Sequence, residues 1–117
     1  MTINDAVSMA NSVTGQETDT ALLVRWLSEL DGQIAFKLYR DETFEPYDPA
    51  DLTTELLVPF PHDGIYRHHL EAMVYFANGE YDRYENARQM REKKLADFRS
   101  WMQRTKSRPC QPGFPRS

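Results

Sequence analysis

The residues whose types could do chemistry begin with three histidines, His62, His68 and His69. Histidine is a common metal ligand and acid–base group, so their spacing decides what they can do. Neighbouring residues on a helix point about 100° apart, so His68 and His69 cannot bind one metal ion from the same face. His68 has Glu71 three residues later but no further ligand nearby. We therefore expect no metal site, with His69 packed or at an interface and His68 exposed.

A nucleophile and a carboxylate pair are the other candidates. Cys110 lies in a proline-rich tail without a neighbouring base to activate its thiol. Glu29 and Asp31 lie opposite the apolar stripe of a predicted helix, which predicts acids facing water rather than a catalytic pair. The sequence also lacks the GxxxxGK[ST], GxGxxG, HExxH and GxSxG motifs. We predict that the protein is not an enzyme and takes no cofactor.

The length and composition are typical of one globular domain. The 117 residues are enough for a real core. No apolar run approaches the roughly 18 to 20 residues of a membrane span, and the N-terminal residues do not resemble a signal peptide. One cysteine excludes an internal disulfide and a cysteine-based zinc site. We therefore expect an intracellular protein that does not associate with a membrane.

The charge is distributed unevenly along the chain. Residues 1–82 contain 15 acidic and 4 basic residues, a net charge of −11, whereas residues 83–117 contain 3 acidic and 10 basic residues, a net charge of +7. This asymmetry indicates that opposite ends meet, either within one chain or between neighbouring chains. Nucleic-acid binding by the basic third is the alternative, although an acidic body opposes wrapping around a polyanion.

Periodicity and helix breakers predict an all-α fold, a small bundle of about four helices. The expected helices cover 3–13, 19–40, 63–77 and 80–104, with Asn4 or Asp5 capping the first. Gly32 weakens the second helix by about 1 kcal/mol relative to alanine, so packing must override that cost or the helix bends. We expect a single helical domain over 1–104 and a flexible, basic, proline-rich tail over 105–117. The apolar stripe of the second helix is Leu22, Leu23, Trp26, Leu27, Leu30, Ile34 and Leu38.

An irregular arm joins the second and third helices. Residues 41–62 contain four prolines, which exclude a long helix. An extended segment of this length is unusual in a small domain and is commonly functional. Residues 56–58 fit either a short strand or an extended stretch. Two interpretations remain open: an arm that packs on, or adds a strand to, a neighbouring subunit, or a loop strapped over the core by Phe44, Tyr47, Leu57 and Phe60.

The last predicted helix presents an unusual stripe, because Arg88 and Arg91 interrupt an otherwise aromatic and apolar face. Buried charges need partners, since an unpaired one is very costly. Either the helix tilts off the core there, with Ala87 and Met90 taking over, or the two arginines meet acids of the second helix or of another subunit. The full stripe is Tyr81, Tyr84, Arg88, Arg91, Leu95, Phe98 and Met102.

A corner at Asn78-Gly79 separates the last two helices, because glycine tolerates the left-handed conformation of a helix C-terminus. Aromatic residues flank this corner on both sides. A four-helix domain of this size cannot easily bury all of them, and tyrosine and tryptophan favour interfaces. This excess predicts an oligomer.

Three runs of the sequence resemble a known family. They are RWLSELDGQIAFKLY (25–39), FEPYDPADLTTELLVPFPHDGIYRHHLEAMVYFANGEYDRYENA (44–87) and FRSWMQRT (98–105). In this order and spacing they resemble the head–tail connector, or neck, proteins of long-tailed bacteriophages and prophages of Gram-positive bacteria. The sequence departs from the family pattern at Arg88 and Arg91, where apolar or aromatic residues are expected.

The resemblance implies a small helical subunit of a homo-oligomeric ring, commonly dodecameric, without enzymatic activity or cofactor. Such a ring docks on the portal protein, extends the DNA channel without sequence-specific DNA binding, and joins a tail-completion or second neck protein. It implies a location in the virion neck, and in the host cytoplasm during assembly. The predicted subunit or portal interface comprises Phe44, Tyr47, Leu57, Val58, Phe60, Tyr81, Tyr84, Arg88, Arg91, Arg104, Lys106 and Arg108.

A different class of function stays open beside the connector. A small nucleic-acid-binding regulator could use the basic last helix to contact phosphates, and its binding would fall steeply with salt. The phosphate contacts would come from Arg88, Arg91, Lys93, Lys94 and Arg99.

Overall fold

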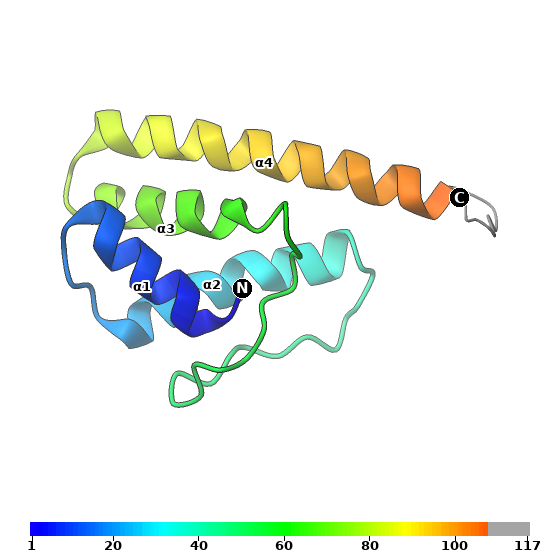
Figure 1. Cartoon of the computed structure of the whole chain (residues 1–117), viewed down its shortest axis with the longest axis horizontal. Helices are drawn as coiled ribbons and strands as arrows, with labels where there is room; N and C mark the ends of the chain where they lie inside the picture. The colour runs from blue at the N-terminus through cyan, green and yellow to red at the C-terminus, as the bar shows by residue number, and fades with distance from the viewer. Residues whose placement is uncertain (108–117) are drawn as a thin grey trace.

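The computed structural model describes residues 1–107 and shows four helices without a strand in that part of the chain. The prediction of an all-α helical bundle is confirmed. Helix α3 lies in the middle, α4 runs along it, and α1 and α2 cover its other side (Figure 1). The helices are α1 (Ile3–Thr14), α2 (Thr20–Lys37), α3 (Gly64–Ala77) and α4 (Tyr81–Ser107).

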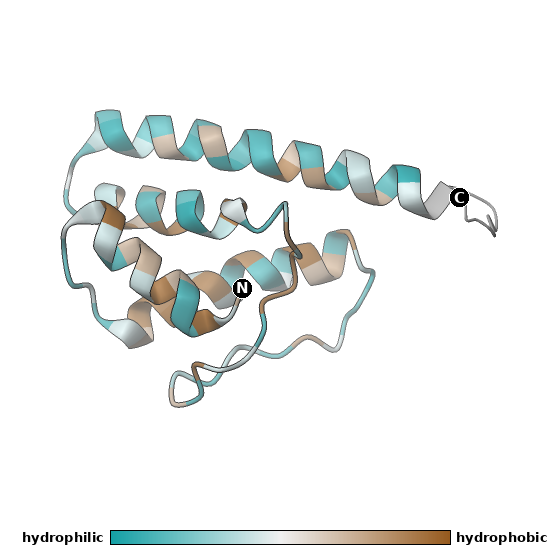
Figure 2. Cartoon of the chain, in the orientation of Figure 1, coloured by the Kyte–Doolittle hydropathy of each residue, from teal (hydrophilic) through white to brown (hydrophobic). Residues whose placement is uncertain are grey.

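The core forms where the apolar faces of α1, α2 and α3 meet. The predicted stripe of α2 supplies much of it, with Leu23, Trp26, Leu27, Leu30 and Ile34 buried. Helix α4 is far more polar than the others, and only a few apolar bands interrupt its hydrophilic surface (Figure 2). It reaches the core at three residues, Ala87, Phe98 and Met102.

The N-terminus is fixed by the arm rather than left free. The N–H groups of Ile3 and Asn4 donate to the carbonyls of Thr54 and Leu52, at 3.0 and 2.9 Å. Thr2 caps α1: its hydroxyl accepts from the Asp5 N–H, and the Asp5 carboxylate accepts from the Thr2 N–H. The prediction that Asn4 or Asp5 is the cap was therefore wrong, because this reciprocal capping box begins two residues earlier than Asn4.

Helix α2 continues through Gly32 without a break. A Cβ atom at this glycine would lie 3.6 Å from the ring of Phe44, so the arm packs directly over the glycine. This packing offsets the low helix propensity. The helix ends at Lys37, three residues before the expected end, and Arg40 takes a positive φ of 57° in the turn that begins the arm.

The corner between α3 and α4 forms as predicted. Gly79 has a φ of 75°, and its N–H and that of Asn78 bond to carbonyls of the last turn of α3. The ring of Phe76 packs against those of Tyr81 and Tyr84, with centroids 5.7 and 5.0 Å apart. Helix α4 extends to Ser107, three residues past the expected end of the domain, and residues 108–117 of the predicted tail lie outside the described part.

Candidate functional site: the arm junction and the α2–α4 groove

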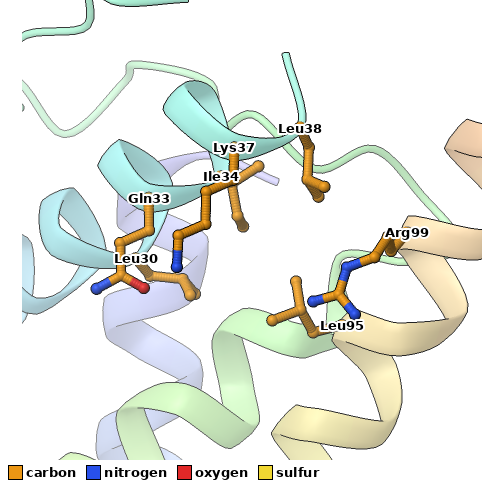
Figure 3. Close-up of a pocket in the computed structure, with 7 residues that line it drawn as sticks. All are labelled: Leu30, Gln33, Ile34, Lys37, Leu38, Leu95 and Arg99. Carbon is orange, nitrogen blue, oxygen red and sulfur yellow. The ribbon is translucent and has the colours of Figure 1, made fainter. Parts of the chain in front are cut away.

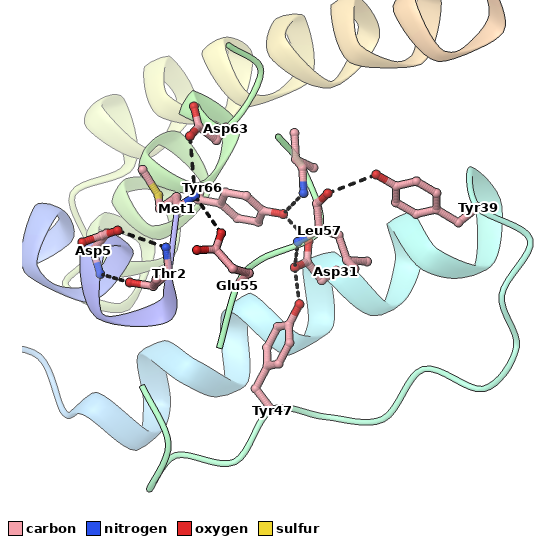
Figure 4. A network of polar contacts seen from close by, with 11 residues as sticks. Met1, Thr2, Asp5, Asp31, Tyr39, Tyr47, Glu55, Leu57, Asp63 and Tyr66 are labelled. Carbon is pink, nitrogen blue, oxygen red and sulfur yellow. Dashed lines mark hydrogen bonds and ion pairs between the residues drawn. The ribbon is translucent and has the colours of Figure 1, made fainter. Parts of the chain in front are cut away.

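The arm, residues 38–63, is attached to the helices through one buried carboxylate. Asp31 is fully buried, and its two oxygens accept three hydrogen bonds (Figure 4). The Tyr47 hydroxyl donates at 2.5 Å, the Tyr66 hydroxyl at 2.7 Å, and the Leu57 N–H at 3.1 Å. The Tyr66 hydroxyl in turn accepts from the Val58 N–H at 2.7 Å. Asp31 thus ties two distant points of the arm to α2 and α3.

Burial dominates the electrostatics of this junction. It raises the pKa of Asp31, because the charged carboxylate loses its hydration, and the three donors only partly oppose that effect. Burial is also the main cause that raises the pKa of Tyr47 and of Tyr66, and the hydrogen bonds to Asp31 and its negative charge add to it, so both hydroxyls stay protonated donors. The arrangement is suited to holding backbone and hydroxyl groups in place.

The prediction that Asp31 faces water was wrong. At about 100° per residue Asp31 borders the apolar stripe beside Leu27 and Leu38, and the arm covers this edge of the helix. The same face carries Ser28, whose hydroxyl accepts from the Tyr47 N–H at 2.9 Å. The signal in the sequence was the long arm itself, which had to cover some surface of the bundle. Glu29, two residues before Asp31, remains exposed as expected.

Most of the predicted arm residues pack on their own chain. Phe44 and Tyr47 are half-buried and meet edge to face, with ring centroids 5.4 Å apart. Val58 is fully buried and belongs to the core, and Leu57 is half-buried. These four residues match the interpretation of a strapped loop. Phe60 does not, because 84% of it is exposed between two exposed prolines.

A groove opens on the other side of α2, between its C-terminal half and α4 (Figure 3). Its cavity measures about 90 Å³, and a wider hollow of about 340 Å³ shares five of its residues and reaches Met73 and His69 of α3. The floor is apolar, whereas Lys37 and Arg99 lie at the rim. The cavity is lined by Leu30, Gln33, Ile34, Lys37, Leu38, Leu95 and Arg99.

A buried histidine forms the end wall of this groove. The Nε2–H of His69 donates to the Trp26 carbonyl at 3.0 Å, so its Nδ1 can accept from the Arg91 guanidinium at 3.1 Å. Burial, helped by the charge of Arg91, lowers the pKa of His69 to about 4. His69 is therefore neutral at physiological pH, and it is packed as predicted.

The two arginines of α4 follow neither expected arrangement completely. Arg91 is mostly shielded, with 17% of its side chain exposed, and contacts His69 of α3 and Glu92 of its own helix. Arg88 pairs with Glu85 one turn earlier, and this carboxylate raises the pKa of the guanidinium. Ala87 is buried as the tilt interpretation required, but Met90 is 44% exposed.

The remaining predicted interface residues are spread along α4. Tyr81 is 61% exposed, and Tyr84 is half-buried at the corner. Arg104 is exposed near the other end of the helix. Lys106 lies in the last turn without a described side chain, and Arg108 lies outside the described residues. The structure therefore does not gather the twelve predicted residues into one patch.

Sequence reasoning missed the role of His62. Its ring packs against both Phe98 and Trp101, with centroids 5.5 and 5.3 Å away, and so fixes the end of the arm on α4. His68 is not exposed as expected but half-buried, with its Nδ1 3.0 Å from the Glu71 carboxylate. Within residues 1–107 no three potential ligands come together to hold a metal ion.

Comparison with protein-family models, with curated proteins and with solved structures finds no match to this chain. No helix among the described residues is both long and apolar enough to cross a membrane.

Proposed function

We propose that the protein is a structural subunit of a bacteriophage head–tail connector ring, which docks on the portal and continues the DNA channel toward the tail. The observation that carries the proposal is the anchored arm. Asp31 and Tyr66 hold its backbone at Leu57 and Val58. The arm nevertheless exposes Phe60, which a loop that only covered the core would turn inward.

The exposed aromatic residues support an assembly role. Phe60 on the arm and Phe76 and Tyr81 at the corner are 84%, 53% and 61% exposed. A single exposed aromatic side chain is normal on a protein surface, whereas several grouped together indicate contact with another protein. The arm and the corner are therefore the two surfaces that we assign to contacts with the portal or with neighbouring subunits.

We infer the particular partners from the resemblance of residues 25–105 to connector proteins. These are further copies of the chain in a ring, the portal protein, and a tail-completion or second neck protein. The role is structural rather than catalytic. Packaged DNA passes through the channel, and the protein resides in the virion neck after assembly in the host cytoplasm.

The decisive experiment is native mass spectrometry of the purified full chain, alone and mixed with the portal of the same phage. We expect a ring of defined stoichiometry on the portal, whether or not the chain forms oligomers alone. A matched measurement on a Phe60→Ser variant tests the arm, and we expect weaker assembly with an unchanged circular dichroism spectrum. A wild-type chain that stays monomeric and does not bind the portal contradicts the proposal.

The nucleic-acid alternative gains little support from α4. Arg83, Arg88 and Arg91 each pair with a carboxylate on or next to their own helix, which reduces the charge they offer to phosphates. A fluorescence-polarisation titration with duplex DNA at low salt tests it directly. Tight binding that falls steeply with salt, in a chain that ignores the portal, would favour the regulator instead.

A further inference from the structure

The arm and the α2–α4 groove lie on opposite faces of the same helix. On α2 the arm meets Ser28 through the Tyr47 N–H and Gly32 through the Phe44 ring. At about 100° per residue these two positions are separated by about 120–180° from Leu30, Ile34 and Lys37 at the groove. Figure 1 shows the first part of the arm on the side of α2 that faces away from α4, before the chain crosses α2 to reach α3. The acidic stretch around Tyr47 therefore cannot close over the groove of its own chain while the Tyr47 N–H stays bonded to Ser28.

The two surfaces carry opposite charges, and most of these charges form no ion pair within the described chain. Residues 38–63 contain seven acidic residues and one arginine. Of these acids, only Glu55 and Asp63 form an ion pair among residues 1–107, both with the N-terminal amine. At the groove, Lys37 and Arg99 likewise form no ion pair in the described part of the chain.

The chemistry of the groove selects its occupant. An apolar floor with a cationic rim suits a segment that offers apolar atoms and carboxylates together. The tail, residues 108–117, contains two arginines and no acid, so its positive charge does not complement the cationic rim. The arm has the right composition: the sequence EPYDPAD from Glu45 to Asp51 alternates acids with exposed prolines and alanine.

We propose that the α2–α4 groove of one copy binds the acidic arm of a second copy. The contact is head-to-tail: each copy offers an arm on one face of α2 and a groove on the other. Such heterologous contacts propagate from copy to copy and close into a ring when the rotation permits. This inference rests on the proposed connector function, because it names the contact between neighbouring subunits of that ring.

The test is a charge swap between the two surfaces of the full-length chain. One variant reverses the groove (Lys37→Glu with Arg99→Glu), and another reverses the arm (Glu45→Lys with Asp48→Lys). Glu45 makes no hydrogen bond or ion pair in the described structure, and the Asp48 carboxylate accepts only from the Ala50 N–H. The matched control, Lys93→Glu with Lys94→Glu, makes the same change in net charge at α4 residues that neither line the groove nor belong to the corner.

Self-association is measured by sedimentation velocity at low salt, and assembly on the portal by native mass spectrometry. Like charges facing each other cost several kcal/mol, so we expect each variant alone to associate about a hundredfold more weakly than wild type. Mixing the two variants restores association, because a wild-type arm then meets a wild-type groove and a basic arm meets an acidic groove. The control associates as wild type does.

The outcomes separate the two proposals. If the groove variant assembles on the portal as wild type does, or if mixing the variants restores nothing, the arm–groove contact is wrong and the connector function stands. If the groove variant instead loses only DNA binding, the groove serves nucleic acid and the contact is again wrong. If the wild-type chain neither self-associates nor assembles on the portal, both proposals fall.

Discussion

The two faces of α2 use charge in opposite ways. On the arm side, Asp31 is fully buried and receives three donors from the arm and α3. On the groove side, Lys37 and Arg99 stand above apolar side chains with no ion-pair partner among residues 1–107. A buried charge with a full set of donors serves its own fold, because removing its partners is costly. Unpaired cations beside an apolar cavity leave binding capacity for another molecule.

The largest expected effect is the loss of the junction. Asp31→Ala leaves the Leu57 N–H and the Tyr66 hydroxyl without acceptors in the interior, and each unsatisfied donor costs about 1–3 kcal/mol. We expect the free energy of unfolding to fall by about 3 kcal/mol in urea denaturation. Tyr39→Phe is the control, since its hydroxyl donates to the Leu57 carbonyl at an exposed site, and it should change little. A stable Asp31→Ala chain would remove the distinction between the two faces.

The next effect is a pH dependence at the end wall of the groove. The pKa of His69 is about 4 in the folded chain and 6.5 in the unfolded chain, so the unfolded state binds the proton more tightly. The contribution of His69 to the free energy of unfolding is fully present above pH 6.5 and is lost as the pH falls toward 4. We expect about 2 kcal/mol of loss between pH 7 and 4.5, measured by urea denaturation. The His69→Gln variant should lack this part of the pH dependence. If the free energy of unfolding falls equally steeply with pH in both chains, the prediction is wrong.

A smaller effect tests how tightly the arm packs on α2. A Cβ at Gly32 would meet the Phe44 ring at 3.6 Å, an ordinary contact distance, so Gly32→Ala fits. Alanine also has a higher helix propensity than glycine. We therefore expect the free energy of unfolding, measured by thermal denaturation, to rise by about 0.5–1 kcal/mol. Gly79→Ala is the opposite control, because its φ of 75° strains any side chain and should destabilise the protein. A destabilised Gly32→Ala chain would show that the arm tolerates no added atom.

The smallest expected effect concerns the groove. Arg99→Glu removes a cation that forms no ion pair in the described structure, so the unfolding free energy of the monomer should change by less than about 0.5 kcal/mol. The measurement is urea denaturation at a concentration too low for association. A large loss would mean that Arg99 serves the fold as Asp31 does, and the contrast between the faces would disappear.

Local signals in the sequence determined the helices and the corner between the last two. The three–four spacing of apolar residues predicted α2 and α3, and Asn78-Gly79 located the corner, because both depend on backbone geometry within a few residues. The four prolines likewise identified the arm. The burial of His69 was also predicted, since it shares the apolar face of α3 with Ile65 and Leu70.

Only the tertiary structure decided what the polar residues do. Asp31 meets Tyr47, Leu57 and Tyr66, which lie 16, 26 and 35 residues away, and Arg91 meets His69 across 22 residues. A periodic pattern records which side of a helix is apolar. It does not record whether a distant loop covers the polar side, because that depends on where the arm lies after the helices have packed. The role of Asp31 and the open groove on the far side of α2 from Ser28 are both consequences of that placement.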